Sequence, residues 1–120
     1  MPRLNIAIVG AGMIGAVHRR AAMLAGAEVR GVCASTPERS REVADRWNVS
    51  RAYGGIDEVI ADPQVQVVHV CTPNALHKPY AEAALKAGKH VVCEKPLATS
   101  IDDAATLAET ARRTGLVATV

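Results

Sequence analysis

Short apolar runs alternate with stretches of helical periodicity along most of this chain. The runs have the length of buried strands, and between them apolar residues recur at three- and four-residue spacing. This alternation predicts an α/β protein with a doubly wound parallel sheet. Right-handed crossovers give the expected strand order 3-2-1-4-5-6, with ligands at the carboxyl ends of the strands. The expected strands are 4–9, 29–33, 65–71, 90–93 and 116–120, and 51–53 is open as a short strand or an extended link.

Residues at the ends of the helical stretches mark where helices begin and stop. Thr36 before Pro37 is typical of an N-cap followed by the first helical residue. Ser100 and Asp103 have the spacing of a capping box with Asp in place of Glu, and Gly115 is expected to end the same helix. The expected helices cover about 13–25, 37–47, 57–61, 75–87 and 101–114.

The first expected strand ends in a glycine-rich turn, and a helical pattern follows at once. Gly10, Gly12 and Gly15 have the G-x-G-x-x-G spacing of loops that bind the diphosphate of a dinucleotide. The first glycine allows the tight turn, the second allows the phosphates to come close, and the third lets helix and strand pack closely. The backbone N–H groups of Met13 and Ile14, in the first helical turn, are expected to attract the phosphates.

The composition suits such a fold and narrows the possible partners. The chain has 120 residues, of which 49% are hydrophobic, and it contains no Phe, so aliphatic side chains have to build the core. The formal net charge of +2 comes from basic residues dispersed among acidic ones, so no basic stripe is present for nucleic acid. No apolar run reaches membrane-spanning length and no signal peptide is recognised, so we expect no membrane partner.

Three cysteines are present, at positions 33, 71 and 93. Their odd number, and the absence of a C-x-x-C pair, indicate reduced thiols in a cytoplasmic protein. Because the three residues lie beside separate strands, their spacing does not favour a shared metal ion, and we expect no metal site.

Three further segments follow strands and should therefore meet the glycine turn at one edge of the sheet. These segments are residues 33–36, 71–77 and 93–96. In a doubly wound sheet, the crevice at that edge is the place where ligands bind. The sequence thus predicts one site assembled from four loops that are far apart in the chain.

Three motifs of the chain resemble one enzyme family. The Gly10–Gly15 turn, the segment Thr72-Pro73-Asn74-x-x-His77 and the segment 87–98, which reads AGKHVVCEKPLA, are similar to those of the glucose–fructose oxidoreductase/inositol dehydrogenase (Gfo/Idh/MocA) family. The likeness covers essentially all 120 residues. It implies that residues 1–120 form an NAD(P)-binding Rossmann domain, the N-terminal part of a longer two-domain enzyme that is usually a homo-oligomer.

The resemblance implies a catalytic role for Lys95, because the matching lysine of the family contacts the substrate and the nicotinamide ribose. The residues give an independent reason. Pro96 ends the strand, so the Lys95 ammonium should project from the sheet edge, where it can hydrogen-bond a substrate oxygen and stabilise negative charge. Glu94 is expected beside the cofactor in the same turn. The alternative is that Glu94 and Lys95 are a solvated pair in a loop.

The segment after the fourth expected strand supplies further candidate contacts. Cys71, Thr72 and Pro73 are expected to line the ribose and diphosphate of the cofactor. Asn74 is open between an amide contact to the cofactor and a cap for the next helix. His77 is open between facing the cofactor and bonding backbone in the first turn of that helix.

The other three histidines receive no part in the site. His69 lies inside an apolar run and is expected to be a core residue with its hydrogen bonds satisfied. His18, in the first helix, and His90, at the start of a strand, are assigned no role.

The end of the second strand departs from the pattern that is common for NAD. An Asp or Glu that binds the adenosine ribose hydroxyls is expected about twenty residues after the glycines, but the chain has Ala34 there. Ser35, Thr36 and Arg39 can instead bind a 2′-phosphate, which favours NADP over NAD. The alternative is that Arg39 and the nearby Arg41 only cover the solvent face of their helix.

These features predict the NAD(P)-binding domain of an oxidoreductase. By resemblance, the full enzyme moves a hydride between nicotinamide and a secondary alcohol of a sugar, polyol or similar compound. A general base would come from the second domain, so this chain alone should bind the cofactor without turnover. The competing hypothesis is a dinucleotide-binding or sensing module without catalysis, which explains the glycines but not Glu94-Lys95-Pro96.

Overall fold

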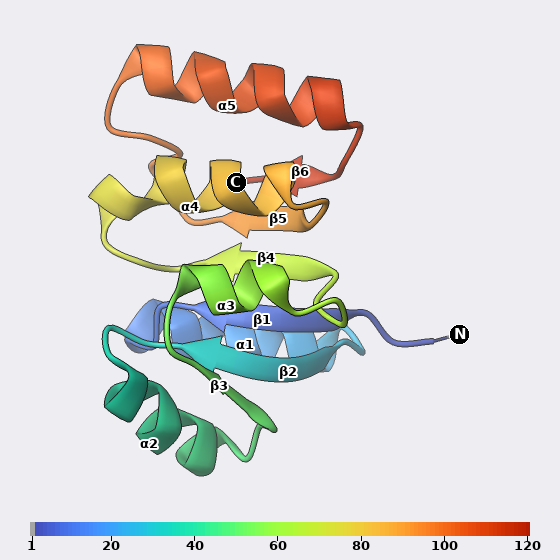
Figure 1. Ribbon diagram of the computed structural model, residues 1–120, viewed down its shortest axis with the longest axis vertical. Helices are drawn as coiled ribbons and strands as arrows, with labels where there is room; N and C mark the ends of the chain where they lie inside the picture. Colours follow the sequence, from blue (N-terminus) through green and yellow to red (C-terminus); the bar gives the residue numbers. More distant parts are fainter. Residues whose placement is uncertain (1) are drawn as a thin grey trace.

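A computed structural model describes residues 2–120 and contains a six-stranded sheet in which all paired strands are parallel (Figure 1). The strand order, β3-β2-β1-β4-β5-β6, confirms the predicted doubly wound topology. The strands are β1 (Asn5–Val9), β2 (Glu28–Cys33), β3 (Arg51–Tyr53), β4 (Val67–Val70), β5 (His90–Cys93) and β6 (Ala118–Thr119). The helices are α1 (Met13–Leu24), α2 (Pro37–Trp47), α3 (Ile56–Ala61), α4 (His77–Lys86) and α5 (Ile101–Thr114), with a 3-10 turn, η1 (Asn74–Leu76), before α4.

Helices cover both faces of the sheet. On one face α1 and α2 pack on the strands, with Ala22 and Trp47 in the same core as Ile8. On the other face α3 and α4 lie in front of the sheet in Figure 1, and α5, at the top of that view, packs against α4. That second core contains mainly aliphatic side chains, among them Val9, Val59, Leu85, Val91 and Leu107. Both cores are largely aliphatic, as the composition predicts.

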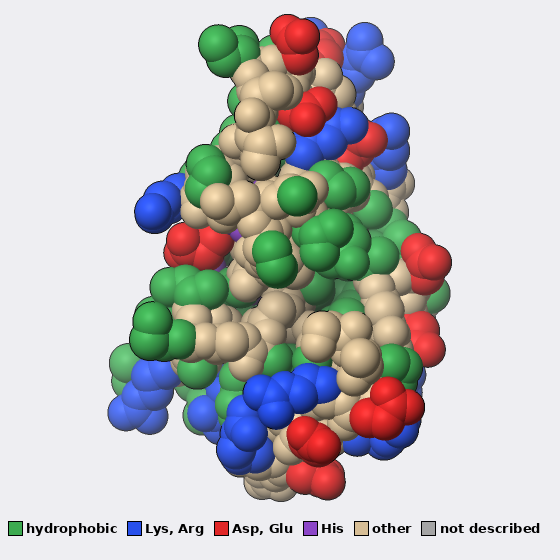
Figure 2. Space-filling model, turned by 90° about the vertical axis from the view of Figure 1, so that its left-hand side faces the viewer, with side chains coloured by type: hydrophobic (Ala, Val, Ile, Leu, Met, Phe, Trp, Pro, Cys, Tyr) green, Lys and Arg blue, Asp and Glu red, His purple; other side chains and the backbone are tan. Residues whose placement is uncertain are grey.

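The carboxyl ends of the parallel strands meet at one edge of the sheet, which we call the carboxyl-end rim. It lies on the left in Figure 1 and faces the viewer in Figure 2, where hydrophobic side chains occupy its middle and Lys and Arg side chains gather at its lower end. The turn after β1 and the turn after β5 both lie there, so Gly10 and Lys95 share this rim. The structure thus places the four predicted loops at one edge.

The fourth strand and the helix after it begin later than their sequence pattern predicts. β4 starts at Val67 because the N–H of Val65 closes a turn onto the carbonyl of Asp62 instead of joining the sheet. The 3-10 turn η1 follows Pro73 and precedes α4. Within residues 2–120 the Asn74 side chain makes no hydrogen bond, so it does not cap this helix.

Two other helices, α2 and α5, begin with the side-chain caps that the sequence predicts. The Thr36 hydroxyl accepts a hydrogen bond from the N–H of Arg39 at 3.1 Å. The Ser100 hydroxyl accepts one from the N–H of Asp103, also at 3.1 Å. These two caps fix where α2 and α5 leave the rim.

A buried carboxylate joins three segments beside α3. Asp62 accepts hydrogen bonds from the Arg30 guanidinium at 2.8 Å, the Tyr53 hydroxyl at 2.7 Å and the N–H of Gln64 at 2.9 Å. The Lys89 ammonium donates to the Asp62 backbone carbonyl at 2.8 Å. Burial alone would raise the pKa of the Asp62 carboxyl, but the hydrogen bonds from Arg30 and Tyr53 outweigh it and hold that pKa well below its usual range.

We expect Asp62→Asn to lower the free energy of unfolding by about 3 kcal/mol at pH 7, because it leaves a partly buried guanidinium without its charged partner. A carboxylate with a lowered folded-state pKa contributes stability above its unfolded-state pKa and loses that contribution as pH falls. The difference in free energy of unfolding between the wild type and Asp62→Asn should therefore be largest above about pH 4 and should decrease as the pH falls below that value. Urea denaturation at several pH values measures it.

Asp45→Asn is the matched control, because Asp45 is exposed on α2 and has no ion pair within residues 2–120. It should change the free energy of unfolding by less than about 0.5 kcal/mol. Equal effects of the two substitutions would contradict a special role for the buried carboxylate.

Candidate functional site

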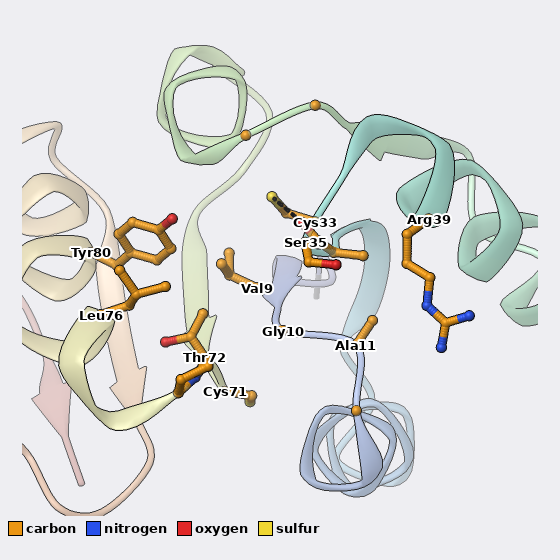
Figure 3. A pocket seen from close by; sticks show the side chains of 15 residues that line it. Val9, Gly10, Ala11, Cys33, Ser35, Arg39, Cys71, Thr72, Leu76 and Tyr80 are labelled. Atoms are coloured by element: carbon orange, nitrogen blue, oxygen red, sulfur yellow. Dashed lines mark hydrogen bonds between the residues drawn. The ribbon is translucent and has the colours of Figure 1, made fainter.

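The loops of the carboxyl-end rim enclose an open cleft with a volume of about 540 Å³. Figure 3 shows it running from Arg39 on α2, past the turn at Gly10, to Thr72, Leu76 and Tyr80. The cleft is therefore long and crosses the sheet at the point where the strand order reverses, between β1 and β4. Its lining residues are Val9, Gly10, Ala11, Gly12, Cys33, Ala34, Ser35, Arg39, Gly54, Gly55, Cys71, Thr72, Pro73, Leu76 and Tyr80.

The three glycines of the first turn are needed for different reasons. Gly10 has a φ of +107°, and a Cβ added to it would lie 2.4 Å from the Cys71 carbonyl oxygen. A Cβ on Gly15 would lie 2.0 Å from the Gly10 carbonyl oxygen. A Cβ on Gly12 would meet no atom within 4 Å, and Gly12 has ordinary extended backbone. The fold itself thus requires Gly10 and Gly15, whereas at Gly12 the missing side chain leaves space open to the cleft.

The helix that starts at this turn presents its N-terminus without a cap. Gly12 is the N-cap residue of α1, makes no side-chain cap hydrogen bond, and is followed by no acidic residue in the first turn. The first N–H groups of a helix have no partner within the helix and carry a partial positive charge. This end of α1 is therefore able to bind an anion, as the sequence predicts for Met13 and Ile14.

The cleft also holds a polar atom without a partner. The Thr72 hydroxyl oxygen is buried and makes no hydrogen bond within the described residues, and Thr72 lines the cleft. A buried hydroxyl without a partner is unfavourable unless a ligand or water satisfies it. The space at Gly12, the uncapped helix and the Thr72 hydroxyl all fit a phosphate- and hydroxyl-bearing ligand.

The loop after β2 forms the other end of the cleft. Ser35 and Arg39 line it, while the hydroxyl of Thr36 is used as the cap of α2. The fully buried Ser40 accepts a hydrogen bond from the N–H of Ala34 at 2.8 Å and so holds the loop in place. Sequence reasoning missed Ser40, because a serine in a helix gives no signal that it reaches back to the preceding loop.

The turn after β5 lies on the rim beside the cleft but does not line it. Lys95 is exposed, and its ammonium makes no ion pair within residues 2–120. The Glu94 carboxylate does not pair with this ammonium and instead accepts a hydrogen bond from the Lys95 N–H at 3.2 Å. The Lys95 ammonium is therefore solvated, as the alternative has it, but the described residues show no direct ion pair between it and Glu94.

His18 belongs to a hydrogen-bonded chain that the sequence did not predict. Its Nε2 lies 3.1 Å from the Glu94 Oε1, and its Nδ1 lies 3.0 Å from the Nδ1 of His69. The hydrogen bond from His18 lowers the pKa of the Glu94 carboxyl. Burial, together with the nearby His18, lowers the pKa of His69 to about 4. His69 is thus a buried core residue, as predicted, and shares a hydrogen bond with His18.

His77 joins two of the rim loops from within the protein. Only 1% of the residue is exposed. Its Nδ1 lies 2.6 Å from the Pro96 carbonyl oxygen and its Nε2 lies 2.9 Å from the Thr72 carbonyl oxygen. Both ring nitrogens therefore face backbone carbonyl oxygens, which accept from a ring nitrogen that carries a proton. His77 does not line the cleft, so the backbone alternative describes its position.

The structure brings together part of the predicted set. The cleft is lined by the predicted residues Gly10, Gly12, Ser35, Arg39, Cys71, Thr72 and Pro73. Predicted residues that lie on or near the rim without lining the cleft are Met13, Ile14, Gly15, Thr36, Asn74, His77, Glu94 and Lys95. Of the residues that sequence reasoning missed, Gly54 and Gly55 follow β3, and Leu76 and Tyr80 belong to η1 and α4. For Gly54 and Gly55 the sequence offers one signal, because a Gly-Gly pair directly follows residues 51–53, a segment that is open as a short strand or an extended link.

The three thiols have no reactive character. Burial raises the pKa of Cys33 and of Cys93 to about 11 and that of Cys71 to about 12, so all three are un-ionised at neutral pH.

Residues 2–120 contain no group of three or more His, Cys, Asp or Glu side chains placed to hold a metal ion. Among the helices of this range, none combines the length and the apolar character needed to cross a membrane.

Comparison with known proteins agrees with the geometry of the cleft. The profile of the GFO_IDH_MocA family, described as "Oxidoreductase family, NAD-binding Rossmann fold", matches residues 4–120. The inositol 2-dehydrogenase of Salmonella typhimurium is 36% identical over 115 residues, which are 93% of this chain and 34% of that protein.

Solved structures with the same fold are also similar in sequence. An NAD binding oxidoreductase from Klebsiella pneumoniae superposes with a TM-score of 0.91 at 38% identity, over 98% of this chain and 34% of that one. Levoglucosan dehydrogenase, solved in complex with NADH and levoglucosan, superposes with a TM-score of 0.87 at 30% identity, over 98% of this chain and 34% of that one. The chain thus spans about a third of the length of the proteins it matches.

We expect His77→Leu to lower the free energy of unfolding by about 2 kcal/mol, because it removes the imidazole N–H donor that faces the carbonyl groups of Thr72 and Pro96 in a buried place. Denaturation in urea measures the loss. Asn74→Ala, three residues earlier and exposed, is the control and should change stability by less than about 0.5 kcal/mol. An unchanged stability of the leucine variant would show that His77 does not hold the two loops.

Proposed function

The chain belongs to the GFO_IDH_MocA family of oxidoreductases with an NAD-binding Rossmann fold, and on that premise we propose that it binds a nicotinamide dinucleotide along the cleft of the carboxyl-end rim. The observation that carries the proposal is the open space at Gly12. Neither the backbone conformation nor the packing of the chain requires a glycine there. A ligand that needs close approach to the backbone does require one.

The residues of the cleft fit the parts of such a cofactor. The diphosphate lies against the N–H groups at the start of α1, where Gly12 leaves room for it. The Thr72 hydroxyl gains the hydrogen-bond partner that it lacks within residues 2–120. The adenosine ribose lies at the end formed by Ser35 and Arg39. The nicotinamide then extends along the rim toward the turn that carries Lys95.

Catalysis is proposed for the full-length protein, of which this chain is the dinucleotide-binding domain. The nicotinamide ring accepts or donates the hydride when the cofactor is bound. The exposed Lys95 ammonium donates a hydrogen bond to the reacting oxygen of the substrate and stabilises negative charge on it. The proposed substrate is a sugar or polyol, which is supported by the relatives that act on inositol and levoglucosan. A general base comes from outside residues 1–120, so the isolated chain binds cofactor without turnover.

A binding or sensing module without catalysis accounts for the cleft equally well. That second function leaves the Lys95 ammonium, exposed at the rim and unpaired within residues 2–120, without a use. The catalytic assignment therefore accounts for more of the rim.

The proposed cofactor preference is for NADP over NAD. No carboxylate follows β2 at the position that would repel a 2′-phosphate, because Ala34 and Ser35 stand there. Arg39 lines the same end of the cleft, and within residues 2–120 it pairs only with the exposed Glu42, at 3.5 Å. An exposed ion pair of this kind is weak, so the guanidinium is available to a phosphate.

We expect Gly12→Ala to weaken binding of NADH and NADPH at least tenfold and to change the free energy of unfolding by no more than about 1 kcal/mol. The added methyl group meets no protein atom, and it occupies the space into which the diphosphate has to come. Gly15→Ala is the contrasting variant and should destabilise the fold itself, because its Cβ would overlap the Gly10 carbonyl. Fluorescence titration and urea denaturation measure the two effects separately.

A wild-type chain that binds neither dinucleotide at millimolar concentration would overturn the proposed function. So would unchanged affinity in a folded Gly12→Ala variant.

We expect Arg39→Ala to weaken NADPH binding roughly tenfold and to leave NADH binding within about twofold, since the guanidinium would contact only the 2′-phosphate. Arg41→Ala is the matched control, because Arg41 is exposed on the same helix and does not line the cleft. Titration of both cofactors to all three chains measures the preference. Tighter binding of NADH than NADPH by the wild type, or an equal loss of both in Arg39→Ala, would contradict the proposed preference.

A further inference from the structure

We propose that His18 is a positioning residue that acts through Glu94 to place Lys95 at the nicotinamide end of the cleft. The inference rests on the proposed function, because it concerns the same rim. It adds a residue from α1 that contacts neither the cleft nor Lys95 directly. The contacts that carry it join α1, β4 and the turn after β5.

The Glu94 carboxylate connects a helix to the turn. One oxygen, Oε1, lies 3.1 Å from the His18 Nε2, and the other, Oε2, accepts the Lys95 N–H at 3.2 Å. The His18 side chain is 14% exposed and that of Glu94 is 26% exposed, so water screens this pair only in part. Two hydrogen bonds in different directions thus fix the carboxylate, and the carboxylate fixes the backbone from which the Lys95 side chain extends.

The direction of each hydrogen bond follows from the chemistry of its partner. The ionised Glu94 carboxylate only accepts, so the Nε2 of His18 donates. His69 stays neutral near neutral pH, because burial and the neighbouring His18 lower its pKa to about 4. When His18 is neutral, its Nδ1 has no proton and accepts from the Nδ1–H of His69 at 3.0 Å. His69 thereby holds the His18 ring in the tautomer that donates to Glu94.

The same helix serves both ends of the proposed site. The N-terminus of α1 faces the space at Gly12, and His18 lies six residues further on, about 9 Å along the helix axis. His18 therefore ties the Glu94–Lys95 turn to the element that would hold the diphosphate. Within residues 2–120, the other hydrogen bonds at Glu94 are those of its N–H to the Val70 carbonyl, of the Cys93 thiol to its carbonyl and of the Lys95 N–H to its carboxylate.

The test compares two ligands on the 120-residue chain. NADH carries the nicotinamide and its ribose, whereas ADP is the adenosine diphosphate part without either. His18→Leu should weaken NADH binding about fivefold and ADP binding by less than about twofold, because the lost hydrogen bond to a charged group acts only at the Lys95 turn. In a 15N-labelled His18→Leu chain, the amide resonance of Lys95 should also shift from its wild-type position. His18→Gln, which can donate to Glu94 and accept from His69, should keep both the affinity and the resonance near wild type.

His90→Gln is the matched control, because His90 lies at the other end of β5, where its Nδ1 accepts from the N–H of Val117 at 3.0 Å. It should leave the NADH affinity and the Lys95 resonance unchanged. His18→Ala removes the same hydrogen bond with a smaller side chain and should reproduce His18→Leu. This second variant decides the question if the leucine chain does not fold.

The outcomes separate the inference from the function on which it rests. A wild-type chain that binds neither NADH nor ADP overturns the proposed function. Unchanged NADH affinity and an unmoved Lys95 resonance in His18→Leu and His18→Ala overturn the inference alone. Equal losses of affinity for both ligands in these variants also overturn the inference, because they indicate that His18 has a general structural role.

Discussion

All paired strands of the sheet run in the same direction, and the rest of the structure depends on this constraint. It brings the loops after β1, β2, β3, β4 and β5 to one rim, although they are spread over more than half of the chain. The strand order reverses between β1 and β4, so the loops diverge there and leave a cleft instead of packing on each other. A site built in this way needs no single continuous motif, and each loop contributes a few atoms.

Within the cleft, the contrast among the glycines separates the needs of the fold from the needs of a ligand. Gly10 and Gly15 lie so close to other backbone atoms that any side chain would clash. Gly12 has open space, and nothing in residues 2–120 accounts for the absence of a side chain there. The buried Thr72 hydroxyl without a partner gives the same indication from the other side of the cleft. Both features become favourable when a dinucleotide lies between them.

Local sequence patterns were enough to predict the fold and part of the lining of the cleft. Apolar runs, the glycine spacing and the capping residues depend on near neighbours in the chain, so the strand order and the caps at Thr36 and Ser100 could be predicted and are confirmed. The roles of His18 and His77 could not, because their partners lie on other elements and depend on side-chain directions. The same holds for Tyr80, whose place at the cleft follows from the packing of α4 on the sheet.

The central claim is that the four rim loops act as one dinucleotide site. Mapping of amide resonances during titration of a 15N-labelled chain with NADPH tests it most directly. The account predicts that the resonances that move belong to the turn at 10–15, to residues 33–36 and 71–73, and to the turn at 94–95. Movement centred on the opposite edge of the sheet, at residues 26–28 and 88–90, would contradict it.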